Sequence, residues 1–251
     1  MRKPLTLASV CLLVTLAVVQ GAQLTGGSPP TPATYRPDQP AWADPNAPQE
    51  PGVAPTIPYR RGEHLQDRLP PGADAVTVVS NNPRPFSLPA PAGMDEMEYH
   101  TREAAAVAVV RPTKATGELA DTSDWIFSTI DADVVEVLKP AAQGQLQPDQ
   151  KTVRFRAAGG SMRIGSTQVT ALDATIEPIR IGATYLIFFF IEPTGTLRAS
   201  PYRRFELDAD QFRTLDVGRP TKLLPGGAPA VLARIRAAST LPPAYKKDGA
   251  R

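Results

Sequence analysis

Few side chains in this sequence have the types and the spacing that chemistry needs. His64 and His100 are the two histidines, and neither has a second histidine or a cysteine at the spacing of a zinc site, which takes three or four ligands. Asp131 and Asp133 are two residues apart, so on a strand both carboxylates point to one face and could do acid–base work if buried together. We expect them on the solvated outer face of a sheet. The sequence therefore predicts no metal, no cofactor and no catalytic residue.

Two further stretches have residue types found in functional sites. Asp121, Thr122, Ser123 and Asp124 offer oxygen ligands for calcium, but the tract is shorter than a known calcium-binding loop, so we expect a turn before the next strand. Ser161, in "GGSMRIGS", suggests a nucleophile turn but does not fit G-x-S-x-G. We expect a hairpin turn there.

Arginines form the most suggestive polar set. On a strand, Val153 and Phe155 would point inward, so Arg154 and Arg156 would both point outward. OB folds bind elongated ligands on a strand face, and an anionic envelope polymer, a lipid headgroup or an envelope protein would suit such a face. Nucleic acid is not expected. The alternative is an ordinary charged face that nearby acids balance. The candidate ligand-binding residues are Arg154, Arg156, Arg180, Arg198 and Arg203.

The first 22 residues have the features of an export signal. Arg2 and Lys3 precede an apolar run from Leu5 to Val19, and small residues follow it. Fifteen apolar residues are short for a spanning helix, which needs about 20. We therefore expect residues 1–22 to be a cleaved signal peptide, and the protein to be secreted or periplasmic. The alternative is an N-terminal membrane anchor. The only cysteine, Cys11, lies in this leader, so the mature chain would have no disulfide.

Proline content separates the remainder of the chain into two regions. The sequence has 28 prolines. Its formal net charge is +2, so the overall charge does not favour nucleic acid or an acidic partner. Residues 23–93 have a proline every few positions and little apolar periodicity, so we expect a disordered proline-rich arm. Within it, Ala73 to Ser80 offers an isolated strand that could dock on the domain. We assign residues 94–241 to a folded domain and residues 242–251 to a basic tail.

Strand patterns dominate the predicted domain. "AAVAVV", "WIFSTIDADVVEVLK" and "KTVRFRA" are rich in β-branched and apolar residues. In the second of these the apolar face changes parity between Val134 and Val137, which predicts a β-bulge in a curving strand. "TKATGELADTSD" is expected to be a loop. The fold class is therefore mainly β, a small OB-like barrel with a short helix before it and a helix after it.

The most apolar run, Tyr185 to Ile191, is too short to span a bilayer as a helix and is expected to be a strand covered on both faces. One face would point into the barrel. A helix over Gly226 to Thr240 has an apolar stripe and would cover the other face. We therefore expect this helix to cover Phe188 and Phe190. An exposed patch for a partner is the alternative.

The order of these segments resembles a group of exported, uncharacterised bacterial domains and the netrin-like OB barrels, which include the tissue inhibitors of metalloproteinases. The likeness rests on "EVLKP", "KTVRFRAAGG" and "GATYLIFFF", and covers roughly Met94 to Ser200 with the final helix. It implies an OB fold and export. Those inhibitors act through an N-terminal cysteine, which the mature chain lacks, so their activity does not carry over.

These observations favour an exported, non-catalytic binding or scaffolding module. The alternatives are a hydrolase or other enzyme with no recognisable motif, and a subunit of a larger envelope assembly. An enzyme would show convergent titratable groups in a concave site. A binding module needs only a basic or aromatic face, and an assembly subunit would show an exposed sheet edge or apolar patch.

Overall fold

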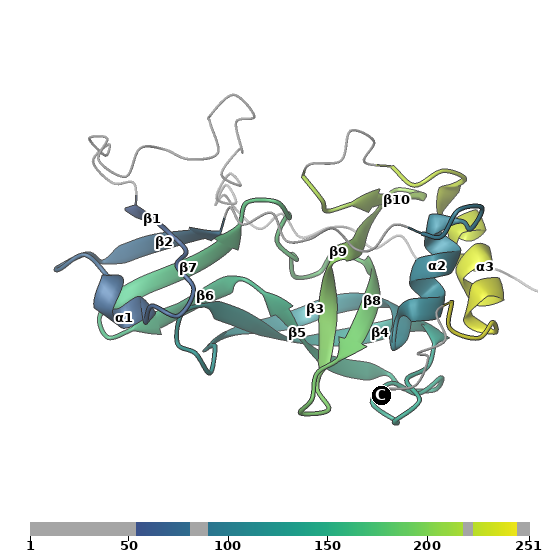
Figure 1. Cartoon of the computed structure of the whole chain (residues 1–251), viewed down its shortest axis with the longest axis horizontal. Coiled ribbons are helices and arrows are strands. Elements are labelled where there is room, and N and C mark those ends of the chain that lie inside the picture. Colours follow the sequence, from purple (N-terminus) through teal and green to yellow (C-terminus); the bar gives the residue numbers. More distant parts are fainter. Residues whose placement is uncertain (1–53, 81–89, 218–222, 245–251) are drawn as a thin grey trace, which may run out of the picture. The chain divides into compact units, whose positions relative to one another are not determined.

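The structure, a computed structural model, describes residues 54–80, 90–217 and 223–244 (Figure 1). The signal peptide predicted over 1–22 lies outside these ranges, as do residues 23–53 and most of the basic tail. Within the described residues, no helix combines the length and the apolar character needed to cross a membrane.

Five strands form a closed barrel, which confirms the predicted mainly β fold class. Strand β9 closes it by pairing antiparallel with β8 and parallel with β5 at Arg198 and Arg156. A short strand, β10 (Gln211–Thr214), pairs antiparallel with the C-terminal end of β9. The barrel strands are β3 (Ala106–Leu119), β4 (Ile126–Lys139), β5 (Thr152–Ala158), β8 (Tyr185–Ile191) and β9 (Leu197–Asp208).

The long β3–β4 hairpin contains the predicted bulge. Val109 pairs with Glu136 and Val110 with Val134, so Val135 drops out of the ladder and is exposed. This confirms the change of face between Val134 and Val137. The loop predicted over "TKATGELADTSD" is wrong in its first half, because β3 continues to Leu119. Its exposed polar residues pair with the equally long β4 rather than forming a connection.

Strand β8 is buried on both faces, as its sequence predicts. Tyr185, Ile187 and Phe189 point into the barrel core. Leu186 and Phe188 point outward into a second core shared with the C-terminal helix. The strand is therefore a buried element of the domain.

Two helices cover this outer core and lie side by side in Figure 1. The first, α2 (Glu96–Glu103), begins at Asp95, whose carboxylate accepts a hydrogen bond of 3.0 Å from the Glu98 N–H. The second, α3 (Gly227–Ser239), contributes Val231 and Ile235, both fully buried. These helices confirm the two that the sequence predicts.

The prediction for the two phenylalanines is confirmed for one and wrong for the other. Phe188 is 1% exposed and belongs to the core that α3 completes. Phe190 is 39% exposed. It faces the Arg203 guanidinium, 5.9 Å from its ring, instead of α3. Alternation places both rings on one face, but α3 covers only the part of that face near Phe188.

Lys139, at the end of β4, holds the C-terminal end of α2. Its ammonium donates hydrogen bonds to the carbonyls of Thr101, Arg102 and Ala104, at 2.9, 2.9 and 2.6 Å. These carbonyls belong to the helix end, where the backbone lacks internal partners and the dipole favours a cation. The lysine of "EVLKP" therefore joins the helix to the barrel.

Replacing Lys139 with methionine should lower the free energy of unfolding by about 2 kcal/mol, because a charged donor to three carbonyls is lost while the apolar stem stays. Chemical denaturation measures this change. Lys151→Met, at an exposed lysine, is the matched control and should have little effect. Equal stability of the two variants would contradict the capping role.

A second sheet contains residues that the sequence assigned to the arm. Its order is β1 (Thr56–Pro58), β2 (Ala75–Ser80), β7 (Thr167–Asp173) and β6 (Gly160–Ile164). Strand β2 pairs in parallel with β7 along all six of its residues. The disordered arm predicted over 23–93 is therefore wrong for residues 54–80, and the alternative of a docked strand near Ala73 to Ser80 is correct. The local "AVTVVS" pattern was outweighed by the proline-rich average around it.

Two glycines carry the chain from the barrel into this second sheet. Gly159 joins β5 to β6 and Gly160 is the first residue of β6; their φ angles are 86° and 138°, a conformation that favours glycine. The hairpin turn expected in "GGSMRIGS" lies further on, at Gly165, between the antiparallel strands β6 and β7. Ser161 is on β6, where its hydroxyl lies 2.8 Å from that of Thr170.

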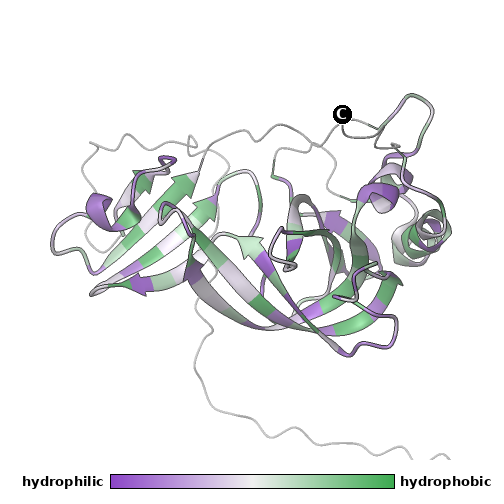
Figure 2. Ribbon diagram, turned by 60° about the horizontal axis from the view of Figure 1, so that its bottom comes forward, coloured by the Kyte–Doolittle hydropathy of each residue, from purple (hydrophilic) through white to green (hydrophobic). Residues whose placement is uncertain are grey.

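The second sheet has its own apolar core. Val78, Val169 and Ala171 pack with Leu65 of α1 (Leu65–Arg68) and with Trp125, which immediately precedes β4. Figure 2 shows hydrophobic and hydrophilic residues alternating along many of the strands. One end of the long β3–β4 hairpin is thus packed against the residues that follow β1.

Candidate functional site

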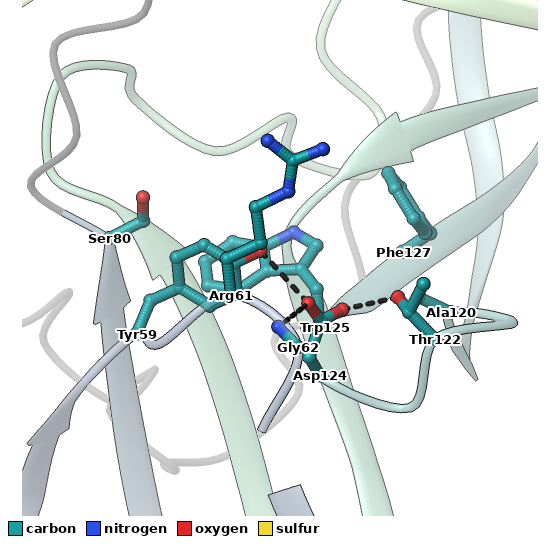
Figure 3. A pocket seen from close by; sticks show the side chains of 9 residues that line it. All are labelled: Tyr59, Arg61, Gly62, Ser80, Ala120, Thr122, Asp124, Trp125 and Phe127. Carbon is teal, nitrogen blue, oxygen red and sulfur yellow. Dashed lines mark hydrogen bonds between the residues drawn. The ribbon is translucent and has the colours of Figure 1, made fainter. Parts of the chain in front are cut away.

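A cavity of about 300 Å³ opens where the chain after β1 meets the connection between β3 and β4 (Figure 3). Aromatic rings and a few polar groups line it, a combination typical of small ligand sites. The lining residues are Tyr59, Arg61, Gly62, Ser80, Ala120, Thr122, Asp124, Trp125 and Phe127.

A tight turn brings these residues together. Ser123 has φ of 55°, in the left-handed region, and its N–H donates to the carbonyl of Ala120 at 2.7 Å. The Leu65 N–H donates to the Ser123 carbonyl at 2.8 Å, which fixes the start of α1 against the turn. The turn expected before β4 is therefore confirmed. It turns Asp124 and Trp125 toward the residues after β1.

Asp124 is the polar centre of the site and is only 3% exposed. Its carboxylate accepts hydrogen bonds from the Gly62 N–H at 2.7 Å, from the Tyr59 hydroxyl at 3.1 Å and from the Thr122 hydroxyl. Burial opposes ionisation, but these hydrogen bonds outweigh it and hold the pKa of Asp124 below its usual value. The carboxylate is therefore ionised at neutral pH, and three donors engage its two oxygens.

Trp125 has an unsatisfied donor. The side chain is 4% exposed, and no atom in the described part of the chain accepts a hydrogen bond from its indole N–H. Tyr59 meets the indole edge to face, with ring centroids 5.0 Å apart. A buried donor without a partner costs about 1–3 kcal/mol. Such a cost in a cavity wall is the observation that marks this cavity as a candidate binding site.

Cations stand on two sides of the cavity. Arg61 is exposed, and Figure 3 shows its guanidinium pointing away from the hydrogen-bonded group at Asp124. Phe127 has the guanidinium groups of Arg156 and Arg198 at 4.6 and 4.9 Å from its ring centroid. Both of those arginines also pair with Glu192, at 3.3 and 3.4 Å. Arg61 is the lining cation for which no ion pair with a described residue is found.

The five arginines expected to bind an anion do not form one basic face. Arg154 pairs with Asp131 directly across the ladder, at 2.7 Å. Arg180 pairs with Glu206, and this contact raises the pKa of Arg180. Arg203 is buried, and burial lowers its pKa. The expectation of an unbalanced positive face is therefore wrong. Acidic residues pair with four of the five, as the alternative interpretation holds: Arg154, Arg156, Arg180 and Arg198.

A second hollow, of about 400 Å³, lies beside the ion pair of Arg154 and Asp131. Thr113 and Thr152 provide its nearest uncharged polar side chains. On the neighbouring strand, Arg154 lies opposite Asp131 and Thr152 lies opposite Asp133. Asp131 and Asp133 therefore have different cross-strand neighbours. The charges of this hollow neutralise each other, and it has no buried unpaired donor like that of Trp125.

The remaining candidates from the sequence lie apart. His64 is exposed at the start of α1, whereas His100 is buried on α2 with its Nε2 3.2 Å from a Glu96 oxygen. Across the described ranges, no group of three histidine, cysteine or acidic side chains is placed to hold a metal ion.

Sequence reasoning missed the aromatic pocket. Tyr59 and Arg61 were placed in the arm, and Trp125 was counted as a strand residue. One local signal points to the site: Trp125 directly follows the polar turn at 121–124, an unusual position for a residue that needs burial.

Comparison of the chain with protein-family models finds no match, and comparison with curated proteins finds none either. The site is therefore interpreted from its own geometry.

Proposed function

We propose that this protein is an exported, non-catalytic binding module and that its ligand occupies the cavity beside Trp125. The observation that carries the proposal is the buried, unpaired indole N–H in the cavity wall. The indole nitrogen is fully covered in this structure, so a ligand atom accepts this hydrogen bond, and removes the cost of the unsatisfied donor, once the side chains over the indole move aside. Export is supported by the charged and apolar leader, and the resemblance to netrin-like barrels supports an envelope location.

The chemistry of the cavity favours binding over catalysis. Asp124 is ionised and so has no proton to give, and hydrogen bonds from three donors lower its affinity for one. The hydroxyl of Tyr59 donates to that same carboxylate. The groups that remain are an aromatic surface, an N–H donor, the Ser80 hydroxyl and the Arg61 guanidinium, which can recognise a ligand without transforming it.

The test is capture from the native envelope fraction with wild-type protein and Trp125→Phe. The substitution removes the N–H and keeps an aromatic ring. We expect the amount of specifically captured ligand to fall at least about tenfold, because the ligand loses its buried hydrogen bond and part of its packing. Mass spectrometry and glycan analysis of the captured material measure this.

Phe190→Leu is the control, since Phe190 is an exposed aromatic residue outside the cavity. It should capture as much as wild type. If Trp125→Phe remains folded by circular dichroism and still captures the same material in the same amount, the cavity is not the binding site.

A further inference from the structure

We propose that the cavity beside Trp125 binds a proline-rich peptide and that its occupant is residues 39–53 of the same chain. This inference rests on the proposed function: the ligand class is a proline-rich peptide, and residues 39–53 are the member of that class that the chain itself carries, with which a ligand from the envelope competes.

The hydrogen-bonding groups of the cavity determine the class of ligand. Trp125 offers an N–H and Arg61 offers a guanidinium, both donors without a described acceptor. Asp124, the carboxylate of the cavity, already accepts from Gly62, Thr122 and Tyr59. The Ser80 hydroxyl, which also lines the cavity, can donate or accept. The cavity therefore favours a ligand rich in acceptors.

An amide that precedes proline meets this requirement, because proline has no N–H and the carbonyl remains a strong acceptor. A sugar hydroxyl fits less well, since burying it also requires an acceptor for its proton. An anionic group inside the cavity would lie near the ionised Asp124, so the prolines of the ligand, and not its acidic residues, are expected to occupy the cavity. The balance of donors and acceptors thus favours a peptide rich in proline.

The aromatic surface supports the same ligand. Tyr59 and Trp125 meet edge to face, and Phe127 lies in the same lining. Proline-rich segments in the polyproline II conformation dock on grooves of this kind, with rings packed on aromatic side chains and carbonyls turned to donors. Such segments are stiff before they bind, so they lose little entropy on binding.

Residues 39–53, "QPAWADPNAPQEPGV", supply this chemistry close to the cavity. They contain Pro40, Pro45, Pro48 and Pro51 and end immediately before Ala54, where the described chain begins. Tyr59 lies only five positions further on. An extended chain spans about 3.3 Å per residue, so ten residues span roughly 33 Å and can fold back to the cavity. A tether this short gives the segment an effective concentration on the order of millimolar.

The test is calorimetric titration of the full chain with a synthetic peptide of residues 39–53. In wild type the chain's own segment competes with the added peptide. In a variant with serine at Pro45, Pro48 and Pro51 that competition is removed. We expect this variant to bind the peptide at least about tenfold more tightly than wild type does. Adding Trp125→Phe to the variant should weaken binding at least about tenfold, and Arg61→Ala, at an exposed side chain, gives an independent check that does not disturb the core.

A second triple variant, with serine at Pro29, Pro30 and Pro32, is the matched control and should behave as wild type. Equal affinity for wild type and both variants would overturn the assignment to residues 39–53. No peptide binding to any form would overturn the ligand class. If the first variant binds the peptide more tightly than wild type only at high protein concentration, the occupant is a segment of a second copy of the chain. That result would also overturn the assignment to the same chain. If Trp125-dependent capture from the envelope persists in either case, the proposed function stands and only this inference falls.

Discussion

Replacing Phe188 with alanine should lower the free energy of unfolding by about 3–5 kcal/mol. Phe188 is 1% exposed and lies in the core formed by the outer face of β8 with α2 and α3. Its ring meets that of Phe205 edge to face, with centroids 6.1 Å apart. Truncation removes the buried ring and leaves a cavity between the barrel and both helices, so the transfer and the cavity costs add. Equilibrium denaturation in urea measures the loss.

Phe190→Ala is the matched control, because it makes the same change two positions along the same strand. Phe190 is 39% exposed, and its replacement should cost no more than about 1 kcal/mol. Comparing the two variants therefore tests whether α3 covers β8 at Phe188 but not at Phe190. If both variants lose the same stability, α3 does not define the boundary that the structure shows.

The barrel was predictable because its strands are local patterns. The alternation of Val153 and Phe155 against Arg154 and Arg156 survives in β5, where the two apolar residues are buried. The unbroken apolar run of β8 required cover on both faces, and the sequence after it supplied one helix with an apolar stripe. What periodicity could not show was how far that helix extends along the strand, which depends on tertiary packing.

The second sheet was harder to predict because its strands find partners far along the chain. Strand β2 is six residues long and pairs in parallel with β7, about 90 positions later. Composition averaged over the proline-rich stretch conceals such a segment, since the stabilising contacts are not local to it. The same reason hides the candidate site, in which Tyr59 and Gly62 meet Asp124 across more than 60 residues.

The charge balance around the arginines could not be predicted from the sequence. The outward positions of Arg154 and Arg156 on their strand were predicted, but a strand pattern does not show which acid lies across the ladder. Asp131 lies opposite Arg154, and Glu192 receives both Arg156 and Arg198. Cross-strand pairs of opposite charge are the ordinary state of such faces. Register therefore decides whether a set of arginines is a binding surface or a balanced one.

Replacing Asp124 with asparagine should lower the free energy of unfolding at neutral pH by about 3–4 kcal/mol, because several hydrogen bonds to a buried charge are weakened or lost. The amide keeps one acceptor oxygen but turns an N–H₂ group toward donors. Tyr59 and Gly62 then lose the carboxylate that holds them against the turn before β4. Hydrogen exchange should accelerate most in the described residues 54–68. Thr122→Val removes one exposed donor from the same carboxylate and should cost much less.

The effect of Asp124→Asn should also depend on pH in a defined direction. Hydrogen bonds lower the pKa of Asp124 in the folded protein relative to about 3.9 in the unfolded chain. The unfolded state therefore binds the proton first as pH falls, so the stability that the carboxylate supplies is complete above about pH 4 and is lost as pH falls through the lowered folded pKa. Denaturation curves of wild type and variant should converge in acid and diverge toward neutrality. A stability difference that stays constant from neutral pH down to pH 2 would show that Asp124 contributes by shape and not by its charge.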